Sequence, residues 1–135
     1  MSRGYGGSAR MVMQDAETIV YEYAAYNLND SRYRNEGRVY DGLITVSRAA
    51  LVEPELHEKI KKLPGGRKQL IVKRIPREVD YRACFDTGRI AVQNSKFCWS
   101  IHSGGVGMIA MFLLFKIFDR YQKDGMLPET VSYFV

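Results

Sequence analysis

Alternation of apolar and polar residues predicts that β-strands make up much of this chain. In the segment Thr18–Tyr26, the side chains of Ile19, Tyr21 and Tyr23 would share one face of a strand. A helix capped by Asp15 is the alternative interpretation of the same segment. Further strands are expected at Val39–Val46, Lys68–Ile75, Arg89–Val92, Phe97–Ile101 and Thr130–Val135.

One long apolar run indicates a helix inside the core. The run Val106–Phe115 is almost entirely apolar and stops at Lys116. A membrane-spanning helix needs roughly twenty apolar residues, so this segment is interpreted as a core helix. Ser103 is a suitable N-cap for it, and Gly125 is a suitable stop after Lys123.

Composition favours a second helix over Arg48–Lys62, with Ser47 as its N-cap. Because Pro54 interrupts this segment, the prediction is either one kinked helix or a turn followed by a helix that begins near Pro54. The Pro-Gly-Gly stretch in Leu63–Gly66 would end the helix. A short helix is also expected at Val79–Phe85.

The irregular mixture of strands and helices predicts a single α+β domain. The chain has 135 residues, which suits one domain with a core of its own. We expect a mixed or mainly antiparallel sheet that packs on one long, largely buried C-terminal helix. Residues 1–10 are rich in glycine and are expected to form a flexible tail, so that the domain would comprise residues 11–135.

The positive charge of the chain is concentrated in one window. Residues 59–77 contain eight basic residues and no acidic one, while the whole chain has 20 Lys plus Arg against 15 Asp plus Glu. The net charge is therefore +5, yet outside the window 12 bases stand against 15 acids, which is a net charge of −3. This asymmetry indicates an anionic partner.

We expect seven of these bases to form two groups, one at each end of the strand Lys68–Ile75, whose apolar centre should belong to the core. At about 3.3 Å per residue, the two groups would lie about 20 Å apart. That spacing suits tracking of nucleic-acid phosphates better than it suits a pocket for one small anion. Solvated lysines that protect an edge strand from aggregation explain the pattern equally well. The candidate binding residues are Lys61, Lys62, Arg67 and Lys68 around the turn, and Lys73, Arg74 and Arg77 at the far end.

The leading hypothesis is a small non-enzymatic binding module whose basic surface contacts nucleic-acid phosphates. The alternative is a protein-interaction module, such as an inhibitor, an adaptor or an immunity-type protein, that binds an acidic partner through the same bases and exposed tyrosines. Tyrosines on an exposed sheet face would also stack on bases, although the strand preference of tyrosine favours a core face. The tyrosines concerned are Tyr21, Tyr23, Tyr26, Tyr33 and Tyr40.

The two histidines are the one route to an enzyme, and no catalytic residue is expected. A metal-independent nuclease would combine His57 and His102 with a lysine of the basic window, and this hypothesis ranks third. Gly104 and Gly105 are interpreted as a tight turn, with a backbone anion cradle as the alternative. Lys61 stands where a zinc-protease motif would need its second histidine, and neither a metal nor a cofactor is expected.

The cysteine content and the N-terminal sequence predict an intracellular protein. Cys84 and Cys98 form no CxxC pair, and the first residues lack the apolar region of a signal peptide. We therefore expect two reduced thiols, a cytoplasmic location and no association with a membrane.

Overall fold

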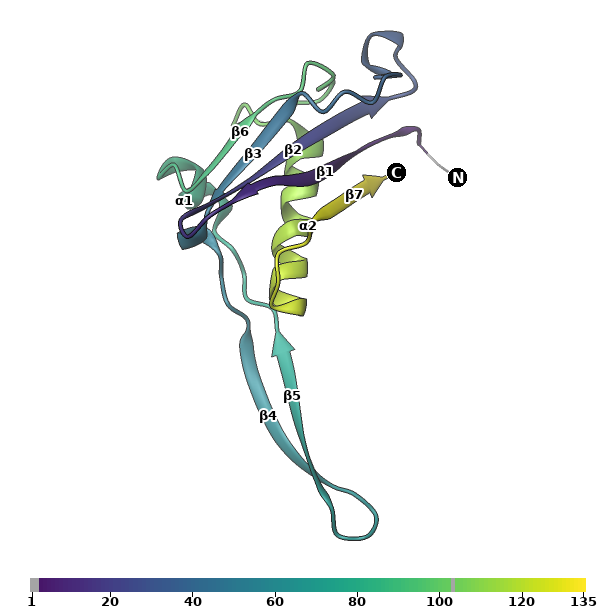
Figure 1. Ribbon diagram of the computed structural model, residues 1–135. Helices are drawn as coiled ribbons and strands as arrows, with labels where there is room; N and C mark the ends of the chain where they lie inside the picture. Colours follow the sequence, from purple (N-terminus) through teal and green to yellow (C-terminus); the bar gives the residue numbers. More distant parts are fainter. Residues whose placement is uncertain (1–2, 103) are drawn as a thin grey trace.

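A five-stranded antiparallel sheet forms the centre of the protein (Figure 1). The computed structural model describes residues 3–102 and 104–135. Across the sheet the strands follow the order β6-β3-β2-β1-β7. Their bounds are β1 Tyr5–Gln14, β2 Thr18–Asn27, β3 Gly42–Ser47, β6 Ile90–Gln93 and β7 Thr130–Phe134.

One long helix covers one face of this sheet. Helix α2, Met108–Asp124, lies along the sheet, and the short helix α1, Tyr81–Asp86, contacts β6 (Figure 1). Two single turns of 3₁₀-helix, Ser31–Tyr33 and Arg48–Ala50, complete the helical elements of the described residues. The arrangement confirms the predicted α+β class with an antiparallel sheet packed on a long C-terminal helix.

The core lies between the sheet and α2. Ile19, Tyr21 and Tyr23 are at most 1% exposed, so the strand face predicted from their alternation is the core face. Most of the apolar run in α2 is buried against it, and the helix ends at Gly125, whose φ of 73° gives the left-handed C-cap expected there. The structure begins α2 at Met108 with Gly107 as the N-cap, and the cap predicted at Ser103 lies outside the described residues.

The expectation of a flexible tail is wrong for residues 5–10, which form the first part of β1. This strand lies between β2 and β7 and pairs with both. A Cβ atom on Gly6 would stand 2.1 Å from the carbonyl oxygen of Tyr133, and one on Gly7 would stand 2.5 Å from a methyl carbon of Ile109. The glycines therefore permit close packing in the sheet and do not mark a mobile segment.

Asp15 caps a turn and not a helix. Its Oδ1 accepts hydrogen bonds from the backbone N–H groups of Glu17, at 2.8 Å, and Thr18, at 2.7 Å, where β1 turns into β2. These two hydrogen bonds stabilise the carboxylate and hold the pKa of Asp15 below its usual value. The strand prediction for Thr18–Tyr26 is thereby confirmed.

The helix predicted over Arg48–Lys62 is wrong. Ser47 caps only one 3₁₀ turn, through a hydrogen bond that its Oγ accepts from the N–H of Ala49. The chain then extends into β4, Glu55–Lys62, which pairs antiparallel with β5, Lys68–Ile75. Pairing with a neighbouring strand satisfies the backbone of β4, and this outweighs the modest helix propensity of its lysines and glutamates.

The strand predicted at Phe97–Ile101 is also wrong, since only Ile101 forms a bridge there, to Gly107. Strands β5 and β6 and helix α1 agree with their predictions to within one or two residues at each end.

Candidate binding sites: a basic arm and an aromatic pocket

Strands β4 and β5 form a two-stranded arm that extends away from the rest of the protein (Figure 1). We use the name arm for residues 55–75. The N–H of Leu63 donates a 2.7 Å hydrogen bond to the carbonyl of Arg67 and closes the turn. Gly65 and Gly66 have φ values of 89° and 83°, which glycine adopts without strain. The Pro-Gly-Gly stretch therefore makes a hairpin turn and does not end a helix.

Strand alternation places four apolar side chains of the arm on one face, together with Glu58, Lys62, Lys68 and Arg74, and we call this side the apolar face. Ile60 lies opposite Leu70, and Val72 lies opposite Glu58, so these side chains project from the same side. The four apolar residues of this face are exposed, at 54% for Leu56, 64% for Ile60, 58% for Leu70 and 47% for Val72. The expectation that the apolar centre of β5 belongs to the core is therefore wrong.

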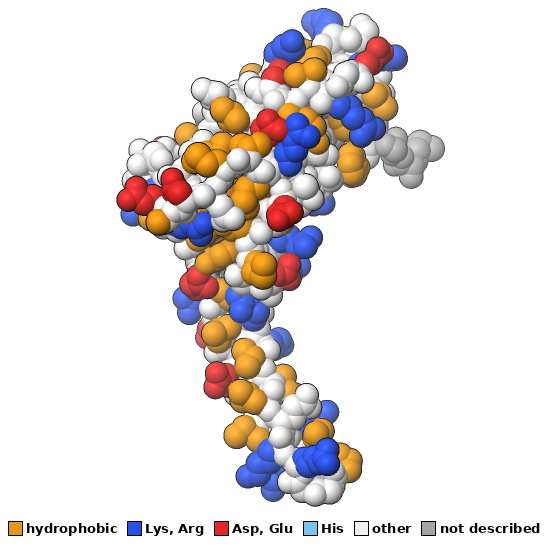
Figure 2. Space-filling view, viewed as in Figure 1, with side chains coloured by type: hydrophobic (Ala, Val, Ile, Leu, Met, Phe, Trp, Pro, Cys, Tyr) orange, Lys and Arg blue, Asp and Glu red, His pale blue; other side chains and the backbone are white. Residues whose placement is uncertain are grey.

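Four bases meet at the far end of the arm, which we call the tip: Lys61, Lys62, Arg67 and Lys68. Lys62 and Lys68 are directly paired across the two strands. Like charges in that position destabilise a hairpin. No side chain of the tip forms an ion pair with any described residue. Figure 2 shows basic side chains gathered at this end of the arm, with apolar side chains along the visible face.

The other three predicted bases lie at the root of the arm, where it meets α2. The Nε–H of Arg74 donates a 2.8 Å hydrogen bond to the carbonyl of Gln122, so this guanidinium already has a structural partner. The backbone of Arg77 forms two hydrogen bonds with the buried Gln122 side chain. Lys73 is exposed on the arm. Arg74 lies six residues after Lys68 on the same strand, which corresponds to a separation of about 20 Å between root and tip at about 3.3 Å per residue.

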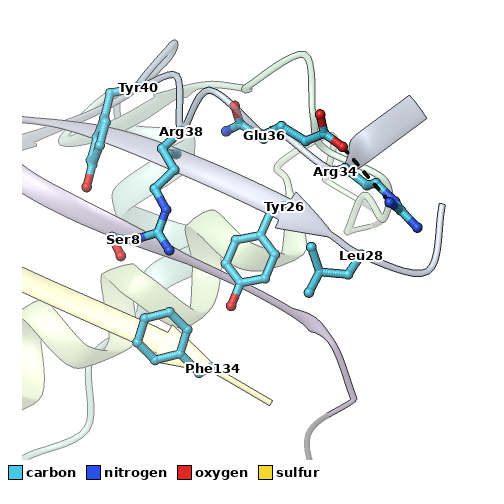
Figure 3. A pocket seen from close by; sticks show the side chains of 10 residues that line it. Ser8, Tyr26, Leu28, Arg34, Glu36, Arg38, Tyr40 and Phe134 are labelled. Carbon is cyan, nitrogen blue, oxygen red and sulfur yellow. Dashed lines mark ion pairs between the residues drawn. The ribbon is translucent and has the colours of Figure 1, made fainter. Parts of the chain in front are cut away.

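A pocket of about 390 Å³ lies on the face of the sheet opposite α2 (Figure 3). Its floor comes from β1, β2 and β7, and its wall comes from the connection between β2 and β3. Side chains that point towards one another across it belong to Ser8, Tyr26, Arg38, Tyr40 and Phe134. The connection between β2 and β3, which forms the wall of the pocket, lies at the opposite end of the protein from the turn between β4 and β5 (Figure 1).

The Asn35 side chain fixes the wall of this pocket. Its Nδ2 donates hydrogen bonds to the carbonyls of Ala25 and Val39, at 3.0 and 3.1 Å, and its Oδ1 accepts one from the Val39 N–H at 2.8 Å. Asn35 is only 6% exposed. Both Asn35 and Arg38 have positive φ, 49° and 47°, which is uncommon for residues other than glycine. The loop that presents Arg38 is thus held in a defined conformation.

The pocket combines aromatic rings with a free cation. Burial raises the pKa of Tyr26, and the nearby positive charge of Arg38 partly offsets that increase. Among the described residues, no carboxylate lies within ion-pair distance of Arg38. Of the predicted tyrosines, Tyr21 and Tyr23 are in the core, Tyr26 and Tyr40 line the pocket, and Tyr33 lies beneath Arg32.

Arg38, Ser8 and Phe134 are pocket residues that no motif in the sequence indicates. The turn-forming residues around Gly37 marked a loop, but no local pattern indicates over which part of the sheet that loop folds.

The structure does not bring the two histidines together. His57 is exposed on β4, where its Nε2 lies 2.9 Å from a carboxylate oxygen of Glu55, and this hydrogen bond lowers the pKa of Glu55. His102 lies near the N-terminal end of α2, whereas the arm that carries His57 meets the C-terminal part of this helix. Helix α2 has 17 residues and is therefore about 25 Å long. Two of the N–H groups proposed for an anion cradle are used locally: Gly104 donates to His102 Nδ1 and Gly105 to the His102 carbonyl. This geometry is that of a turn.

The cysteines are free thiols, and burial raises the pKa of both Cys84 and Cys98. Within residues 3–102 and 104–135, His, Cys, Asp and Glu form no cluster of three or more that could hold a metal ion. In the same part of the chain, no helix has the length and apolar character needed to cross a membrane.

The basic arm and the aromatic pocket are the basis for proposing a function, because comparisons with known proteins found no match. No family model, no curated protein and no solved structure matches the chain.

Proposed function

We propose that this protein is a small nucleic-acid-binding module that contacts phosphates with the basic tip of its arm. The observation that carries the proposal is the like-charged pair of Lys62 and Lys68, with Lys61 and Arg67 beside it and no acidic partner among the described residues. Such a cluster is unfavourable in the free protein. Phosphates between the cations would relieve the repulsion and release counterions.

The dimensions of the arm support a nucleic-acid ligand. Each strand has eight residues, which corresponds to a length of about 26 Å. A two-stranded β-ribbon fits the major groove of a B-form duplex, which is about 12 Å wide. A tip carried that far from the rest of the protein reaches phosphates without a clash between the duplex and the sheet. Because the tip offers cations and few other polar groups, we expect contacts to the backbone and little preference for base sequence.

The test is the salt dependence of binding to labelled DNA and RNA of equal length. Replacement of all four tip bases by glutamine should weaken binding and reduce the slope of log K against log salt concentration by about 3.6, at about 0.9 per phosphate contact. The matched control replaces Arg32, Arg82, Arg89 and Lys96, which are exposed bases outside the arm, and changes the net charge equally. If the wild type shows no salt-sensitive binding, or if both variants lose it equally, the proposal fails.

A second candidate function is a protein-interaction module that binds an acidic partner, and the apolar face of the arm favours it. Exposed apolar patches commonly mark interaction sites, and the bases of the tip would complement a partner with acidic residues around an apolar centre. In that case Ile60→Ser with Leu70→Ser should abolish co-purification of a stoichiometric partner that resists nuclease, and nucleic-acid retention should be absent. From the cysteines we expect either function to operate in the cytoplasm.

A further inference from the structure

The pocket opposite α2 has the chemistry of a site for a flat, anionic ligand. The rings of Tyr26 and Phe134 lie side by side with centroids 6.4 Å apart and an inclination of 37°. Phe134 is 64% exposed, although it belongs to the last strand of the sheet. An aromatic pair with one exposed and one half-buried ring provides a stacking surface. A volume of about 390 Å³ is in the range of small-molecule sites.

The cations around the pocket differ in how much of their charge is already compensated. Arg34 lies 3.9 Å from Glu36, and Arg10 is bound to Glu22 and stacks on the ring of Tyr40 at 3.9 Å. Arg38 has no such carboxylate among the described residues, and its side chain extends into the pocket between Tyr26 and Tyr40 (Figure 3). A guanidinium in this position can bind two oxygens of one phosphate.

The site is formed before any ligand arrives. One hydrogen bond of the Asn35 side chain ties the loop to Ala25 of β2, and two more tie it to the backbone of Val39 within the loop. These bonds flank Arg38 and hold its backbone in the left-handed conformation. Backbone conformations of this kind carry strain and are enriched at functional sites. Little loop entropy would be lost when a ligand binds, which favours affinity.

We propose that this pocket binds a nucleotide, with the base stacked on Tyr26 and Phe134 and the phosphate held by Arg38. An aromatic wall alone would accept any apolar ring, and a lone arginine would accept any anion. Their combination across one pocket selects a ligand that carries a ring and a phosphate a few ångströms apart. The source is either a free nucleotide or an unpaired nucleotide in a strand. The inference does not depend on phosphate binding by the arm, because no residue of the arm lines the pocket.

Calorimetric titration with adenosine 5′-monophosphate tests the proposal, with adenosine and inorganic phosphate as partial ligands. We expect saturable binding of the nucleotide and at least tenfold weaker binding of each partial ligand. Saturation by inorganic phosphate at equal affinity would overturn the stacking part of the proposal. Absence of nucleotide and strand binding at millimolar concentration would overturn all of it.

Two variants locate the ligand in the pocket. Arg38→Asn removes the cation and keeps a residue type that tolerates positive φ, so nucleotide affinity should fall at least tenfold while adenosine binding is unchanged. Tyr26→Leu should weaken nucleotide and adenosine alike. If Tyr26→Leu does not fold, Phe134→Leu replaces it, since this exposed ring contributes little to the core. Arg32→Asn is the matched control on the same loop outside the pocket, and an equal loss in that variant would overturn the assignment.

The same titration distinguishes a free nucleotide from a nucleotide within a strand, and it distinguishes binding in the pocket from binding at the arm. A single-stranded pentanucleotide that binds more tightly than the monophosphate, and depends on Arg38, identifies a strand as the source; the reverse order identifies a free nucleotide. Replacement of the four tip bases by glutamine should leave binding of the monophosphate unchanged. Failure of the arm to bind nucleic acid would therefore not count against the pocket, and failure of the pocket would not count against the arm.

Discussion

The side chain of Gln122 determines how the arm is attached, and its replacement by methionine should destabilise the protein measurably. Gln122 is 4% exposed in the last part of α2. Its Oε1 accepts a 2.6 Å hydrogen bond from the N–H of Arg77, and its Nε2 donates a 2.8 Å hydrogen bond to the carbonyl of Arg77. This pair of hydrogen bonds joins the segment after β5 to the helix. Methionine has nearly the same volume and flexibility, so the substitution removes the hydrogen bonds without leaving a large cavity.

The expected loss follows from the two hydrogen bonds. Each contributes about 1 kcal/mol net, so Gln122→Met should lower the free energy of unfolding by about 2 kcal/mol. For a chain of 135 residues, the unfolding entropy is about 0.28 kcal/mol/K near 60 °C, and the melting temperature should fall by about 7 °C. Arg74 should keep its hydrogen bond to residue 122, because the acceptor is the backbone carbonyl of that residue and not its side chain.

Thermal unfolding followed by circular dichroism measures the change, and amide hydrogen exchange at Arg77 shows whether the attachment is lost. Gln69→Met is the matched control, since Gln69 is an exposed glutamine on the arm itself. A decrease in melting temperature of less than 2 °C, with the Arg77 amide as protected as in the wild type, would refute the assigned role of Gln122. An equal decrease in the control would also refute it.

Three further predictions concern the core, alkaline pH and the arm. Tyr23→Phe should cost about 1–3 kcal/mol of stability, measured by urea unfolding, because the buried N–H of Ser95 loses the hydroxyl that accepts its 2.9 Å hydrogen bond; an unchanged midpoint would contradict this. Burial raises the pKa of Tyr23 to about 12, above its unfolded value near 10. The folded state therefore favours the neutral hydroxyl of Tyr23, so the stability that this preference contributes below about pH 10 should be lost as the pH rises towards 12. The Tyr23→Phe variant should lose less stability over this range, measured relative to its own stability at neutral pH. His57→Ala should change stability by less than about 0.5 kcal/mol at pH 7, because the side chain is exposed and its hydrogen-bond partner Glu55 is equally exposed.

Local patterns in the sequence determined the fold class and the core faces. The alternation of Ile19, Tyr21 and Tyr23 has the period of a strand, and a buried face follows directly from it. The apolar run of α2 was long enough for a helix and too short for a membrane span, and Gly125 ended it as expected. The charge count likewise identified the four bases of the tip, since residues on both sides of a tight turn must be neighbours.

Tertiary structure alone decided the course of β4 and the environment of β5. The sequence of Glu55–Lys62 suits a helix, and it is a strand because β5 lies beside it after the turn. The apolar residues of β5 looked like core residues, but the arm leaves the sheet before they can reach it. Neither result can be read from a window of ten residues, because the strand that pairs with β4 and the sheet from which the arm departs both lie outside such a window.

The pocket is the clearest case of a feature that the sequence did not reveal. Ser8, Arg38 and Phe134 are separated by 30 and 96 residues along the chain. They line one pocket because β1 pairs with β7 and because the Asn35 side chain ties the loop after β2 back to Ala25. Residue type and periodicity specify which face of a strand is buried. They do not specify which strands become neighbours, since that choice depends on the summed packing and hydrogen bonding of the whole sheet.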